Sequence, residues 1–106
     1  MTTEELMKHA GEALRIIRIL TAADETMRYG VMLRLVGVIP ADGQWHIRYR
    51  RLASQILYAA AAVAKLNKEK IAKGRGEPGI EFWRFVNTTG DAGAGIYEDV
   101  ALKVAD

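Results

Sequence analysis

Apolar residues near the start of the chain recur every three or four positions, which is the spacing of an amphipathic helix. They are Leu6, Ala10, Ala13, Leu14, Ile17 and Leu20. Thr2 and Glu5 have the spacing of a capping box, so we expect a helix over residues 3–20. Ile16 and Ile19 widen its apolar stripe, which we interpret as burial on two sides. A homodimer or a protein partner on this helix is the alternative.

Two further helices are expected downstream. The first is short, is capped by Thr26 and ends at Gly37, and residues 40–43 then form a turn. The third helix is expected from Trp45 to Lys73, because its apolar residues share one side and a run of four alanines favours helix. A break of this helix near Asn67 stays open.

The pattern changes after a glycine-rich loop at residues 74–79. The aromatic and β-branched run at residues 80–86 is typical of a strand. Residues 87–90 supply a turn, and Ile96 with Tyr97 can then return antiparallel, so the sequence predicts a C-terminal β-hairpin.

Together these elements predict the α+β class, as a mostly helical, three-helix, winged-helix-like domain with a C-terminal β-hairpin. A length of 106 residues with 50% apolar content suits one hydrophobic core, and Trp45 and Trp83 are expected to pack in the core or on the hairpin rather than to stack on bases. Within this single domain, residues 1–25 are an N-terminal helix extension, residues 26–97 the winged-helix-like core and residues 98–106 a tail.

The residue inventory excludes several classes of site. The chain has no cysteine, which excludes disulfides, thiolate zinc sites and cysteine nucleophiles. His9 and His46 have no carboxylate at a recognisable spacing, and the acidic residues of the C-terminal segment lack an EF-hand spacing. We therefore expect no enzyme, no metal and no cofactor. No apolar run approaches the ~20 residues that cross a bilayer, and the N-terminus is acidic, so no membrane association and a cytoplasmic location are expected.

The charge is uneven along the chain. Residues 45–84 hold nine basic and three acidic residues, a net charge of +6, whereas the whole chain carries +2. Such a stretch suits phosphate or an acidic protein, although basic residues on a helix are often only its solvated face. On a continuous third helix the later cations would lie ~25–40 Å from its start, so we interpret them as solubilising. They are Lys65, Lys68, Lys70, Lys73 and Arg75.

A short helix and a turn that lead into a basic helix, followed by a hairpin, have the element order of a winged helix-turn-helix. The third helix is then the recognition helix, and His46 lies at its entrance. Arg48 and Arg51 share one helical face, so both can address one groove of duplex DNA. Arg50 points to another side and suits a carboxylate or a backbone phosphate. Arg84 would belong to the wing.

Two segments carry a resemblance to known proteins. They are residues 28–37, Arg-Tyr-Gly-Val-Met-Leu-Arg-Leu-Val-Gly, and residues 82–95, Phe-Trp-Arg-Phe-Val-Asn-Thr-Thr-Gly-Asp-Ala-Gly-Ala-Gly. Together they resemble small bacterial and phage-associated proteins. More distantly, over residues 26–97, they resemble the winged-helix DNA-binding domain of alkylguanine alkyltransferases and alkyltransferase-like proteins.

This resemblance implies DNA binding without alkyl transfer. In the family, a Pro-Cys-His-Arg-Val-Val-Asn stretch carries the acceptor cysteine, and the similar stretch here is residues 81–87. Phe82 stands in place of the cysteine and Trp83 in place of the histidine, so the resemblance implies that the transfer chemistry is lost. It also implies that Tyr29 contacts a DNA phosphate and that one of the three arginines beginning the third helix enters the base stack.

Two functions from different classes follow. The first is a non-enzymatic DNA-binding protein that contacts duplex DNA through the third helix and the hairpin. The second is a protein-interaction module, such as a phage-associated inhibitor or accessory factor. The small net charge of the chain and the acidic C-terminal residues 85–106 favour the second function.

Overall fold

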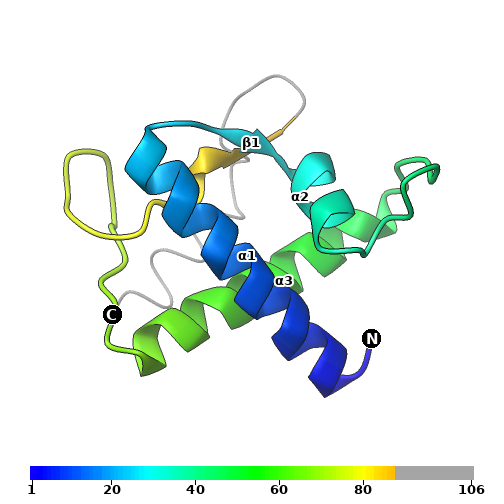
Figure 1. Ribbon diagram of the computed structural model, residues 1–106, viewed down its shortest axis with the longest axis horizontal. Helices are drawn as coiled ribbons and strands as arrows, with labels where there is room; N and C mark the ends of the chain where they lie inside the picture. Colours follow the sequence, from blue (N-terminus) through cyan, green and yellow to red (C-terminus); the bar gives the residue numbers. More distant parts are fainter. Residues whose placement is uncertain (88–106) are drawn as a thin grey trace.

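The computed structural model describes residues 1–87 and shows a mostly helical α+β protein, which confirms the predicted fold class (Figure 1). Within residues 1–87, three α-helices hold more than half of the residues, and a short 3-10 helix and a two-stranded sheet are the other regular elements. The elements are α1 (Thr3–Ala23), β1 (Met27–Arg28), α2 (Tyr29–Leu35), α3 (Arg48–Leu66), the 3-10 helix η1 (Phe82–Arg84) and β2 (Phe85–Val86).

Helix α1 begins at the predicted capping box. The Thr2 hydroxyl accepts a hydrogen bond from the Glu5 backbone N–H at 3.1 Å, and the Glu5 carboxylate accepts one from the Thr2 N–H at 3.4 Å. The helix runs three residues further than predicted and ends at Asp24, whose φ of 56° is left-handed. The three added residues are a threonine and two alanines, and alanine favours helix even at the exposed surface where these two lie.

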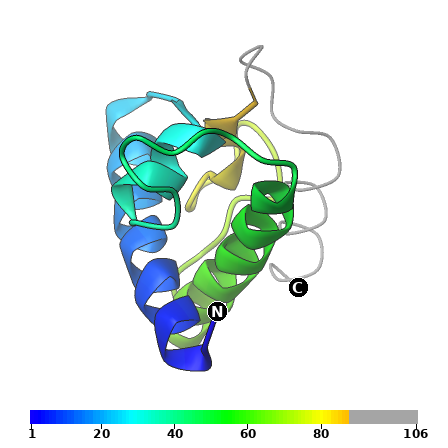
Figure 2. The same ribbon diagram turned by 90° about the vertical axis from the view of Figure 1, so that its right-hand side faces the viewer.

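The hydrophobic core lies mainly between α1 and α3, which cross one another (Figures 1 and 2). Alanines on both helices are fully buried, so the two backbones approach closely. Residues 1–25, predicted as an extension, therefore supply one side of this core. The buried residues of the two helices are Ala10, Ala13, Leu14, Ile16, Ile17, Leu20, Tyr49, Ala53, Ile56, Leu57, Ala60, Ala61 and Ala64.

The second helix begins later than predicted. Met27 and Arg28 form strand β1, so Thr26 does not cap α2, and the helix has no side-chain cap. Gly37, with a φ of 85°, follows its end as expected. The predicted turn at residues 40–43 is confirmed by a 2.8 Å hydrogen bond from the Gly43 N–H to the Pro40 carbonyl.

The predicted strand over residues 80–86 is wrong for most of its length. Phe82 and Phe85 are both buried, and their three-residue spacing places them on one side of a 3-10 turn, whereas a strand would alternate them. Within this run only Phe85 and Val86 form a strand, and they pair in parallel with Met27 and Arg28. The expected second arm, at Ile96 and Tyr97, lies outside the described residues.

Helix α3 is shorter than predicted at both ends. Residues 45–47 precede it, and the break near Asn67 is confirmed, because the helix ends there and Lys68 is left-handed with a φ of 59°. The chain then turns through a loop that Ile71 and Ile80 close with a parallel bridge. Within residues 1–87, no helix combines the length and the apolar character needed to cross a membrane.

Candidate nucleic-acid interface

The first turn of α3 carries a concentration of positive charge. Arg48, Arg50 and Arg51 are all exposed, and the turn contains no acidic residue. Within residues 1–87, none of the three side chains forms an ion pair. Because a helix N-terminus is itself positive, three cations there are unfavourable for the isolated fold. An anion that binds at this end would remove that cost.

One of these arginines is held in place by an aromatic side chain. The Arg48 guanidinium lies 5.2 Å from the ring centroid of Tyr49, and its Nη2 donates to the Tyr49 hydroxyl at 3.4 Å. Tyr49 is buried, and its ring centroid lies 5.8 Å from that of Trp45. The guanidinium therefore packs against the Tyr49 ring, whose neighbour is the Trp45 ring.

His46 lies at the entrance of α3, as predicted, and is exposed. Its Nδ1 accepts a hydrogen bond from the Arg48 backbone N–H at 3.1 Å. This bond satisfies one of the free N–H groups at the start of α3, whose N-cap residue Ile47 has no side-chain acceptor.

The position of Tyr29 does not favour its predicted phosphate contact. Tyr29 begins α2, only 9% of its surface is exposed, and its hydroxyl oxygen is buried. A duplex phosphate cannot reach a buried hydroxyl without rearrangement of the protein, so Tyr29 is a core residue here.

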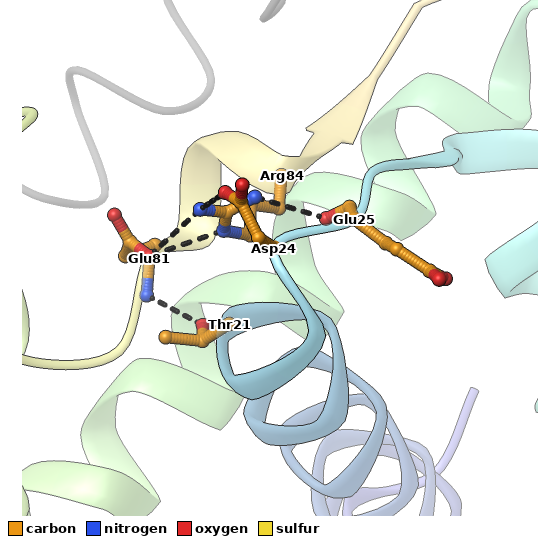
Figure 3. A network of polar contacts seen from close by, with 5 residues as sticks. All are labelled: Thr21, Asp24, Glu25, Glu81 and Arg84. Atoms are coloured by element: carbon orange, nitrogen blue, oxygen red, sulfur yellow. Dashed lines mark hydrogen bonds and ion pairs between the residues drawn. The ribbon is translucent and has the colours of Figure 1, made fainter.

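The predicted role of Arg84 in a wing is also not favoured, because its charge is bound by carboxylates of the protein (Figure 3). Its Nη2 donates to Asp24 at 2.7 Å and to Glu81 at 3.0 Å, and its Nη1 donates to the Glu25 carbonyl at 3.3 Å. The hydrogen bond to Asp24 raises the pKa of the Arg84 guanidinium, and burial opposes that rise. With two carboxylates beside it and a side chain only 13% exposed, Arg84 has little charge to offer a phosphate.

Two exposed apolar residues beside the arginines escaped prediction. Trp45 is 46% exposed and Ile47 is 66% exposed, although Trp45 was expected to pack in the core. Trp83 does pack against the core, as expected. The helical spacing that identified buried residues elsewhere does not apply to Trp45 and Ile47, because residues 45–47 lie before the helix.

The turn before α3 is held by another arginine. The Nη1 of Arg34, in α2, donates to the Gly43 carbonyl at 2.9 Å. This contact joins α2 to the segment that leads into α3, so it helps to position the arginines of the first turn. Nothing in the sequence pattern distinguished Arg34 from a solvated residue.

The described part of the chain gives no metal centre, since no three His, Asp or Glu side chains within residues 1–87 could hold an ion together. The acidic residues near the C-terminus lie outside the described residues. In comparisons with known proteins, no family model, no curated protein and no solved structure matches the chain.

Proposed function

We propose that the protein is a non-enzymatic, cytoplasmic DNA-binding protein of winged-helix type that contacts duplex DNA through the N-terminal end of α3. The observation that carries the proposal is the set of three exposed arginines in the first turn of that helix, without an ion-pair partner in residues 1–87. Arginine guanidinium groups bind phosphates and guanine edges through paired hydrogen bonds.

The ion pairs of two other arginines support this assignment. Arg18 donates to Glu69 at 2.7 Å, and Arg84 is bound by Asp24 and Glu81. Arg18 and Arg84, which join distant segments of the fold, thus have carboxylate partners, whereas the three arginines at the start of α3 have none within residues 1–87. A helix N-terminus that presents arginines to solvent is complementary to the phosphates of a duplex.

The short helix α2, the turn and α3 follow one another as in a helix-turn-helix, and Figure 1 shows α2 and the start of α3 at the same end of the molecule. Because Arg84 is bound by carboxylates of the protein, the proposed interface among the described residues lies on α3. Arg48 and Arg51 are three residues apart on this helix, so both reach the same groove.

Fluorescence anisotropy with random-sequence duplex DNA tests this function. We expect saturable binding that weakens steeply between low and moderate salt, because each phosphate contact releases counterions. The double variant Arg48→Ala/Arg51→Ala is expected to lose binding, whereas Lys8→Ala/Arg15→Ala, with the same loss of charge on exposed positions of α1, is expected to retain it. Absence of binding by the wild type at low salt, or equal affinity of the two double variants, would contradict the proposal.

One observation favours the second function, a protein-interaction module. Val31 and Leu35 lie four residues apart on α2 and are 45% and 60% exposed. A protein partner could cover this apolar pair. If Val31→Ser/Leu35→Ser folds normally and binds DNA as the wild type does, the pair serves no role in DNA binding and a partner pull-down with this variant as control becomes the next experiment.

A further inference from the structure

A second group of cations lies at the other end of α3. The basic loop, residues 70–79, follows the helix and carries Lys70, Lys73 and Arg75. Because α3 ends at Leu66, these side chains belong to a separate loop and do not continue the helix. Figure 1 shows this loop and the start of α3 at opposite ends of the long axis of the molecule, which measures 37 Å.

The basic loop has a defined shape. Ile71 and Ile80 close it by their bridge, and the Lys73 backbone N–H donates to a Glu77 carboxylate oxygen at 3.1 Å. Gly79 has a φ of 130°, and a Cβ there would lie 2.7 Å from the Lys70 carbonyl oxygen, so this close approach needs glycine. The side chains on the loop are therefore presented from a fixed backbone.

Local electrostatics explain some of the neighbouring charges but not all. Lys65 and Lys68 lie near the C-terminal end of α3, where cations complement the helix dipole. Glu69 is engaged by Arg18. Lys70 and Arg75 are exposed and form no ion pair within residues 1–87. Two cations on a shaped loop are thus left without an internal role.

The two groups of cations lie toward opposite ends of the long axis of the molecule, and the 37 Å length of this axis is close to one turn of DNA, about 34 Å. We infer that Lys70 and Arg75 form a second phosphate contact, on the backbone of the same duplex, about one turn away from the groove that α3 enters. This inference rests on the proposed function. Arg75 stands between two glycines, so neighbouring side chains do not obstruct its approach to a phosphate.

The length of the duplex decides whether it can make the second contact in addition to the first. An 8-bp duplex is about 27 Å long and cannot occupy both ends when it is centred on the first turn of α3, whereas a 20-bp duplex of about 68 Å can. Anisotropy titrations with both duplexes at 50 and 200 mM salt would compare the wild type with Lys70→Gln/Arg75→Gln. The control Lys8→Gln/Arg15→Gln removes the same charge from exposed positions of α1.

On the 20-bp duplex, loss of two phosphate contacts lowers the salt slope by about 1.8, so the advantage of the wild type over the loop variant shrinks on the order of tenfold from 50 to 200 mM salt. On the 8-bp duplex the loop variant and the control are expected to bind equally well. A longer duplex offers the protein more binding positions. Because the variants are compared on the same duplex, this number is equal for all of them and does not affect the comparison.

Three other results would overturn the inference, and each differs from the others in which duplexes and variants bind. If the loop variant matches the control on the 20-bp duplex while both bind, the second contact is absent and the proposed function stands. If the loop variant is equally weakened on both lengths, the loop belongs to the first contact and no second contact exists. If the wild type binds neither duplex, the proposed function itself fails. Circular dichroism of both variants checks that the fold is retained.

Discussion

The Nη2 atom of Arg84 donates to the Asp24 carboxylate at 2.7 Å and thereby joins the turn before β2 to the C-terminal end of α1. Figure 3 shows the same guanidinium between Asp24 and Glu81, with Glu81 also donating its backbone N–H to the Thr21 hydroxyl at 3.1 Å. Residues 60 positions apart are thus fixed by one side chain, so Arg84 organises the fold and lies outside the proposed interface.

Replacement of this guanidinium is expected to destabilise the protein. In Arg84→Met the apolar part of the side chain is retained, but the half-buried Glu81 loses its charged partner, which costs about 1–3 kcal/mol in the free energy of unfolding. Urea denaturation measures this change, with Arg15→Met, at an exposed position of α1, as the control. A folded Arg84→Met protein of unchanged stability that no longer binds DNA would reverse the assignment and return Arg84 to the interface.

The ion pair between Arg18 and Glu69 predicts a pH dependence of stability. The hydrogen bond from Arg18 holds the pKa of Glu69 below its ordinary value in the folded protein. The pair therefore stabilises the fold above the ordinary glutamate pKa, about 4.3, and this contribution is lost as the pH falls through the lower folded value. Because both side chains are partly exposed, the contribution is about 0.2–1 kcal/mol.

Glu69→Gln tests that pH dependence. The variant is expected to be less stable than the wild type at pH 7, and the difference should shrink as the pH falls below the ordinary glutamate pKa and through the lower folded value. Thermal melts at several pH values measure it. A stability difference that stays constant from pH 7 to pH 3 would show that the glutamate charge is not its source.

Gly79 gives a prediction for the basic loop. Gly79→Ala places a Cβ 2.7 Å from the Lys70 carbonyl oxygen at a φ of 130°, so the loop must change its shape at a cost of about 1–3 kcal/mol. Gly74→Ala is the matched control, because a Cβ at Gly74 meets no atom within 4 Å. If both substitutions leave the midpoint of urea denaturation unchanged, the loop does not have the closed geometry described above.

Helical periodicity and capping predicted the beginning of α1 and its buried stripe, because both signals are local. Strand β2 could not be predicted from its sequence neighbours, because its partner strand β1 is distant in the sequence. Met27 of β1 pairs with Phe85 of β2, 58 positions later. The run of aromatic residues was interpreted as alternation, whereas the burial of both Phe82 and Phe85 reflects a three-residue turn.

The candidate site was predictable only as far as it lies on one helix. The shared face of Arg48 and Arg51 follows from helical spacing alone. The resemblance placed Tyr29 at an interface and the element order placed Arg84 there. The burial of Tyr29 and the ion pairs of Arg84 are tertiary features that neither argument could predict.

The most direct test of the account is Arg51→Glu, measured both for stability and for DNA affinity. At the first turn of α3 an acidic residue complements the helix dipole and can pair with Arg48, so the free energy of unfolding should rise by about 0.3–1 kcal/mol. Affinity for duplex DNA should fall about tenfold or more, because a contact to phosphate or base becomes repulsive. Unchanged DNA affinity in a folded Arg51→Glu protein would contradict the claim that this end of α3 is the DNA-binding surface.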